Sequence, residues 1–176
     1  MKARFATAWL DGCSGCHMSF LDIDEKLIEL CDRIDLVYSP IVDIKEFPEN
    51  VDVTLVEGTV NNAHNEERIR LIRSRTKTLV ALGDCAVTGN VPSMRNSFPK
   101  DQVLKYAYVE NSKYNPQIPK QNIPTLLPHA EPIHSRVKVD LYVPGCPPSA
   151  DLIEYVVTEL LEGRKPELAS VARFGK

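Results

Sequence analysis

Short apolar segments alternate with segments of helical periodicity along most of the chain. The apolar segments, which we interpret as strands, are residues 3–10, 35–39, 51–56, 77–82 and 137–143. Helical patterns occupy residues 17–31, 65–76 and 149–162, and Asn65 is expected to cap the second of these helices. This alternation predicts an α/β fold with a doubly wound, mainly parallel sheet.

The segment from residue 91 to residue 136 does not follow this alternation. It lies between the fourth and fifth predicted strands, has weak periodicity and is rich in proline from Pro99 to Pro132. Long irregular segments in compact domains are usually functional or disordered. We therefore expect one domain over residues 1–176, in which residues 91–136 form an insertion that becomes ordered against a partner. The alternative is that residues 91–136 form a flexible insertion at the surface.

The charge balance and the apolar runs argue against two classes of partner. The chain has 21 Lys and Arg against 24 Asp and Glu, a net charge of −3, which does not suit a nucleic-acid-binding surface. The apolar runs are all shorter than the roughly 18 residues that a membrane-spanning helix needs. The first twelve residues also lack an apolar region long enough for a signal peptide. We therefore expect a cytoplasmic protein that binds neither nucleic acid nor membrane.

Four of the five cysteines come directly after predicted strands. Cys13 and Cys16 form a C-x-x-C motif after the first strand, Cys85 follows the fourth and Cys146 the fifth. Because the carboxyl ends of parallel strands lie at one edge of the sheet, we expect these thiols to converge there. In a reducing compartment such a set indicates metal or redox chemistry. A [4Fe–4S] cluster explains all four best, and a four-thiolate zinc site and a thioredoxin-like pair are the alternatives.

The sequence says less about the roles of the other reactive side chains. Glu57 follows the third strand at the same edge, where a carboxylate could relay protons or tune a cluster, or only bond to a helix cap or loop. His17 could donate to a cluster sulfur, or simply begin a helix. Cys31 is expected on the apolar face of the first helix, as a core residue. The remaining histidines have no ligand spacing and are expected at the surface or at an interface: His64, His129 and His134.

Four motifs resemble the small subunit of [NiFe] hydrogenases. They are W-L-x-G-C-S-G-C-H-M-S-F-L-D, E-G-T-V, G-D-C-A and P-G-C-P-P, and the resemblance extends from Trp9 to about Leu161. It is strongest for the short small subunits of soluble, cytoplasmic NAD-reducing hydrogenases. A weaker resemblance links the chain to the cluster-bearing subunit of respiratory complex I. That subunit typically has two adjacent cysteines in place of the C-x-x-C motif, which favours the hydrogenase.

The resemblance implies a fold, a cofactor and partners. It implies a flavodoxin-like domain in which Cys13, Cys16, Cys85 and Cys146 hold one proximal [4Fe–4S] cluster. Hydrogen would be split at a nickel–iron site in a large subunit, because the large subunit's two C-x-x-C motifs are absent from this sequence. Electrons would then pass through the cluster to diaphorase subunits, whose FMN and iron–sulfur centres reduce NAD. We expect a single cluster, because few residues follow Cys146. A complex I-like, quinone-linked subunit and a zinc-stabilised binding module are the alternative functions.

Overall fold

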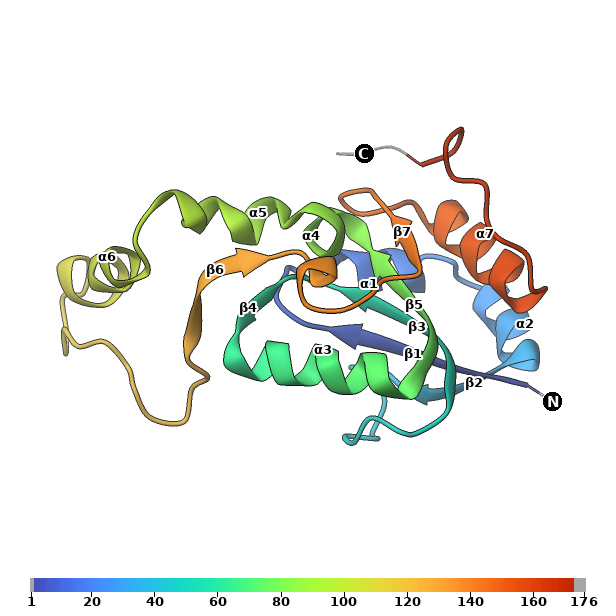
Figure 1. Cartoon of the computed structure of the whole chain (residues 1–176), viewed down its shortest axis with the longest axis horizontal. Coiled ribbons are helices and arrows are strands. Elements are labelled where there is room, and N and C mark those ends of the chain that lie inside the picture. Colours follow the sequence, from blue (N-terminus) through green and yellow to red (C-terminus); the bar gives the residue numbers. More distant parts are fainter. Residues whose placement is uncertain (1, 173–176) are drawn as a thin grey trace.

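A parallel sheet forms the centre of the computed structural model, which describes residues 2–172. Its strands are β1 (Ala3–Trp9), β2 (Ile34–Tyr38), β3 (Val51–Glu57), β5 (Thr76–Leu82) and β7 (Leu141–Val143). They are arranged in the order β2-β1-β3-β5-β7, with every neighbouring pair parallel (Figure 1). Counted along the chain, this is the 2-1-3-4-5 order of flavodoxin-like folds. The predicted α/β fold with a doubly wound, mainly parallel sheet is confirmed.

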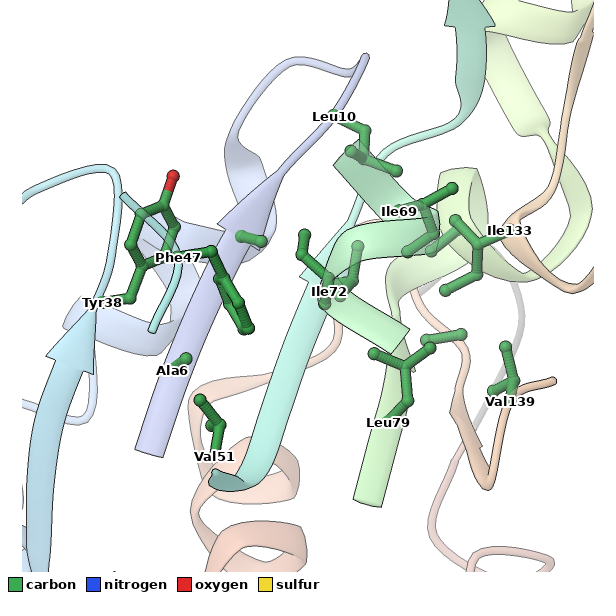
Figure 2. Close-up of a cluster of buried hydrophobic side chains, with 14 of the residues drawn as sticks. Ala6, Leu10, Tyr38, Phe47, Val51, Ile69, Ile72, Leu79, Ile133 and Val139 are labelled. Atoms are coloured by element: carbon green, nitrogen blue, oxygen red, sulfur yellow. The ribbon is translucent and has the colours of Figure 1, made fainter. Parts of the chain in front are cut away.

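Helices cover both faces of the sheet. The main ones are α1 (Gly15–Leu21), α2 (Lys26–Arg33), α3 (Ala63–Arg75), α4 (Gly83–Thr88) and α7 (Ala150–Leu161). Helix α3 buries Ile69 and Ile72 on one face, as Figure 2 shows. The opposite face packs against α1, α2 and α7, through residues such as Phe20, Leu30 and Ile153. This double coverage explains why consecutive residues of β3 and β5 are buried, on both faces of the sheet.

Alternate residues of the central strands enter the two packed layers. In β5, Leu79 faces the α3 layer, where it is drawn in Figure 2, and the adjacent Val80 faces the α7 layer. Both side chains are completely buried. Since side chains of a strand alternate between faces, a shift of one residue would exchange the two layers, so packing fixes the register.

The first predicted helix, residues 17–31, is two helices in the structure. Helix α1 ends at Leu21 and α2 begins at Lys26, with Asp24 between them at φ +55°. Residues 22–25 form turns between the two helices, so the apolar face of one continuous helix is not maintained. The prediction that Cys31 packs in the core is therefore wrong: its side chain is exposed, whereas the adjacent Leu30 is buried.

The cap of α3 also differs from the prediction. The helix begins at Ala63, and the side chain of Asn62 caps it by accepting the backbone N–H of Asn65 at 2.9 Å. Asn65, the predicted cap, lies inside the first turn and is buried. Asn62 and Asn65 are equally good helix caps by residue type. The strand β4 (Val60–Asn62) ends directly before the helix, which places Asn62 at the cap position.

The insertion, residues 91–136, has regular structure at both ends. It contains most of α5 (Asn90–Ser93), then η1 (Met94–Ser97), α6 (Lys100–Lys105), η2 (Tyr106–Glu110), β6 (Leu126–Glu131) and η3 (Ile133–Ser135). Strand β6 pairs antiparallel with β4, and Figure 1 shows α6 extending away from the sheet. The Arg95 guanidinium holds this arm by donating to Asn61 and to the carbonyls of Leu127 and Pro128. The insertion is thus anchored at its base and exposed at its tip.

The last strand is shorter than predicted. β7 is limited to Leu141–Val143: Val137 still bonds to the η3 turn, through its N–H to the carbonyl of Ile133, and Val139 packs in the core without joining the ladder. Among residues 2–172, the structure contains no helix of the length and apolarity needed to cross a membrane.

Candidate iron–sulfur site

Four cysteines lie at the carboxyl edge of the sheet, in or next to the turns that follow its strands. Cys13 follows β1 and Cys16 is the second residue of α1, while Cys85 lies in α4 directly after β5. Cys146 follows β7, the neighbour of β5. Cys16 and Cys85 are half-buried, and Cys13 and Cys146 are exposed. The site is therefore open to the surface on one side and packed against the domain on the other.

Glycine backbone approaches the thiols closely. A Cβ added to Gly83 would lie 2.2 Å from Sγ of Cys16, which places the β5 turn directly against the β1 turn. Gly83 also has φ +82°, a conformation that residues with a Cβ rarely adopt. A Cβ on Gly15 would lie 3.3 Å from Sγ of Cys13. The sulfurs thus occupy a cradle that side chains at these positions would fill.

The thiols also affect one another electrostatically. Burial raises the pKa of Cys85 to about 11, and the thiols of Cys146 and then Cys13 add to this rise. Burial raises the pKa of Cys16 well above its usual range, and the Glu57 carboxylate adds to this effect. Cys85 and Cys13 raise the Cys16 pKa further. Without a metal, the Cys16 and Cys85 thiols hold their protons at neutral pH, whereas iron binding would stabilise their thiolates.

Four cysteine thiols are the donor set that an iron–sulfur cluster requires. Within residues 2–172, no group of three or more His, Cys, Asp or Glu side chains is arranged to hold a single metal ion. In a [4Fe–4S] cluster each cysteine binds a different iron, so the sulfurs need not meet at one point. The donor set of four thiols around a glycine-lined cradle fits such a cluster.

Two hydrogen bonds join the β5 and β7 turns. The backbone N–H of Asp84 donates to the carbonyl of Gly145 at 2.8 Å, and the backbone N–H of Gly145 donates to Oδ1 of Asp84 at 2.7 Å. The Ser19 hydroxyl, from α1, donates to the carbonyl of Pro148. These bonds tie all three cysteine-bearing turns together. Nothing in the sequence indicates this role of Asp84 beyond its place next to a cysteine.

Glu57 lies at the end of β3, between the β1 and β5 turns, and is 2% exposed. Its Oε2 accepts the backbone N–H of His17 at 3.0 Å and lies 3.3 Å from Nδ1 of the same residue. The other ring nitrogen, Nε2, is 3.0 Å from Oγ1 of Thr7. The His17 ring therefore contacts Glu57 and Thr7 rather than a cysteine sulfur. Glu57 both binds the first turn of α1 and lies beside Cys16.

Two site residues could not be predicted from the sequence. Nδ2 of Asn90 lies 3.3 Å from Sγ of Cys146, to which it donates, and the backbone N–H of Val91 donates to the Cys85 sulfur. A Gly-Asn pair shortly after the G-D-C-A motif was the only available signal, and it indicates a turn without showing where the turn points. The three histidines expected outside the site are all exposed: His64, His129 and His134.

Comparison with known proteins identifies relatives over nearly the whole chain. The family described as NADH ubiquinone oxidoreductase, 20 Kd subunit, matches residues 13–160. A subunit of the vhu F420-non-reducing hydrogenase of Methanocaldococcus jannaschii is 43% identical over 161 residues, which cover 90% of this chain and 56% of that protein. The delta subunit of the NAD-reducing hydrogenase HoxS of Cupriavidus necator is 39% identical over 174 residues, covering 96% of this chain and 83% of that one.

Comparison with solved structures also identifies a hydrogenase. A chain in the crystal structure of NAD+-reducing [NiFe]-hydrogenase in the H2-reduced state has a TM-score of 0.94 and 40% sequence identity to this chain, and the match covers 99% of both. The present chain spans little more than half the length of the M. jannaschii protein. The chain belongs to the NADH ubiquinone oxidoreductase 20 Kd subunit family and, within it, is homologous to the delta subunit of NAD-reducing hydrogenase.

Proposed function

We propose that this chain is the electron-transfer small subunit of a cytoplasmic NAD-reducing [NiFe] hydrogenase. In this proposal Cys13, Cys16, Cys85 and Cys146 hold one proximal [4Fe–4S] cluster. The observation that carries it is the meeting of three cysteine-bearing turns around a cradle of glycine backbone. The similarity to the HoxS delta subunit supports the hydrogenase assignment.

The cluster would supply one-electron transfer between a two-electron hydrogen reaction and a distant acceptor. The domain contributes the thiolate ligands, and its paired turns hold them in place before iron binds. Cys13 and Cys146 are exposed, which leaves this side of the site accessible to a partner subunit. The packed strands behind Cys16 shield the other side from water. Solvent exposure and hydrogen bonds to sulfur are the main means by which a protein sets the potential of such a cluster.

Apolar side chains near the cysteines support a protein partner on this side. Met18 and Leu21, on α1, are exposed although α1 begins at the cysteine motif. Val91 and Met94 are exposed on the segment that contacts Cys85 and Cys146. Exposed apolar groups gathered around a site are typical of protein interfaces. We propose that they face the hydrogenase large subunit, with its Ni–Fe site, and that the insertion faces a subunit of the same complex.

The remaining partners follow from the same proposal. Electrons leaving this chain would pass to diaphorase subunits that carry FMN and iron–sulfur centres and reduce NAD. Glu57 would act at the edge of the cluster, by relaying protons or by tuning the cluster with its carboxylate.

Affinity purification of the native complex tests the proposal. We expect iron and acid-labile sulfide in amounts that match a [4Fe–4S] cluster in this subunit, a nickel-containing large subunit in the same complex, and hydrogen-dependent reduction of NAD. Fractionation should place the activity in the cytoplasm. Stoichiometric zinc without iron would contradict the proposed cluster. A complex without nickel that reduces quinone would instead identify a complex I-like subunit.

A further inference from the structure

The first two residues of α5 bring two N–H groups to two different cysteines. Asn90 donates through its side-chain Nδ2 to Sγ of Cys146 at 3.3 Å. The next residue, Val91, donates its backbone N–H to the Cys85 sulfur. Cys85 follows β5 and Cys146 follows β7, so a single short segment contacts the ligands of two separate turns.

Bonds that do not involve sulfur hold the start of α5 in its conformation. The backbone N–H of Gly89 donates to the carbonyl of Cys85 at 3.0 Å, and Gly89 has φ +92°. The Ser93 hydroxyl donates to the carbonyl of Asn90 at 2.7 Å, while the Ser93 N–H donates to the carbonyl of Gly89 at 3.2 Å. Asn90 itself has φ +35°, in the left-handed region that asparagine tolerates better than most residues. The donor is therefore positioned before a cluster is bound.

The orientation of the amide follows from the chemistry of its partner. A cysteine thiolate that binds iron can only accept hydrogen bonds, so the NH₂ end of Asn90, and not its oxygen, must face Sγ of Cys146. Reduction of a cluster adds one electron, which increases the negative charge on its sulfurs. An N–H group directed at a sulfur stabilises this reduced form more than the oxidised form, and so raises the reduction potential.

We propose that Asn90 is a positioning residue that, together with the Val91 N–H, raises the reduction potential of the cluster held by the four cysteines. This inference rests on the proposed function. Of the two donors, the Val91 N–H belongs to the backbone, whereas the Asn90 donor is a side chain that substitution can remove. Val91 is 62% exposed and Met94 is 70% exposed, so a subunit docked here would exclude water from both N–H···S contacts. Excluding water strengthens such contacts.

Two substitutions in the purified complex test this role. Asn90→Gly removes the donor but tolerates the positive φ, and Asn90→Asp keeps the shape of the side chain while replacing the donor by a negative acceptor. The matched control is Asn122→Gly, at an exposed position of the insertion with φ +59°. Iron content and a redox titration followed by electron paramagnetic resonance give the occupancy and the midpoint potential of the cluster.

We expect full iron content in all three variants. The midpoint potential should be lower than wild type in Asn90→Gly, lower still in Asn90→Asp, and unchanged in Asn122→Gly. An iron-replete Asn90 variant with the wild-type potential would overturn the inference. Loss of iron from both Asn90 variants would also overturn it, by showing that the amide serves assembly. A wild-type complex without an iron–sulfur signal from this subunit would instead refute the proposed function, so the two failures are distinguishable.

Discussion

At the scale of single residues, the two classes of cysteine should respond differently to substitution. Cys31 is exposed on α2, so Cys31→Ser should change the free energy of unfolding by no more than about 0.5 kcal/mol, the usual range for surface substitutions. Cys146→Ser removes a proposed ligand and should lower the iron content. Iron analysis and urea unfolding of both variants provide the measurement. Equal loss of iron from the two would show that the ligands were assigned wrongly.

Gly83 should be intolerant of even a methyl group. A Cβ there would lie 2.2 Å from Sγ of Cys16, at a φ of +82°. We expect Gly83→Ala to displace this sulfur and reduce the iron content strongly. The control is Gly163→Ala, with φ +71° and no described atom within 4 Å of the added Cβ, which should cost about 1 kcal/mol through the backbone alone. Full iron content in Gly83→Ala would contradict the proposed packing around the cluster.

Glu57 should matter more for turnover than for assembly. In Glu57→Gln the amide oxygen can still accept the backbone N–H of His17, so α1 keeps this contact. We expect hydrogen-dependent NAD reduction to fall, because the carboxylate charge beside Cys16 is lost, while the iron content remains at the wild-type level. If iron and activity fall in proportion, the role of Glu57 is structural.

The cysteines that are candidate ligands could be grouped from the sequence, but the residues that contact them could not. Cys13, Cys16, Cys85 and Cys146 could be grouped because each follows a predicted strand. Asn90 could not, because its contact depends on where a turn points after packing. Predictions from periodicity fail where the backbone breaks, as the exposure of Cys31 shows.

At the scale of secondary-structure elements, the insertion offers a test of partner contact. Its distal part carries exposed side chains such as Tyr106 and Tyr114, whereas β6 already pairs with β4 inside this chain. We expect amide hydrogen exchange over residues 98–125 to be slower in the complex than in the dissociated chain. Exchange in β6 should be similar in both, which provides an internal control. Equal exchange of residues 98–125 in the two states would refute a partner-facing role.

The strands were predictable where they are buried on both faces. β1, β3 and β5 are rich in apolar residues and buried over much of their length, and their ends fall within a residue or so of the prediction. β4 and β6 were not predicted because they are short and only partly buried, and because Pro128 interrupts β6. The pairing of β4 with β6 is a long-range contact, which periodicity within a short window does not report.

At the scale of the whole molecule, the order of strands explains the site. β1, β3, β5 and β7 are successive neighbours in the sheet, and all run in the same direction. Their carboxyl ends carry, in that order, the C-x-x-C motif, Glu57, Cys85 and Cys146. Residues separated by more than a hundred positions thereby meet at one edge. The sequence predicted this convergence because it depends only on the strands being parallel and adjacent.

The central claim is that electrons between hydrogen and NAD must pass through the cluster of this chain. Cys16→Ala in the purified complex tests it most directly, with size-exclusion chromatography to verify assembly, because metal binding contributes to the stability of such sites. We expect hydrogen-driven NAD reduction to collapse, while NADH oxidation by an artificial dye persists, since that reaction needs only the proposed flavin-bearing subunits. An assembled Cys16→Ala complex that lacks this cluster, yet reduces NAD with hydrogen at the wild-type rate, would contradict the claim.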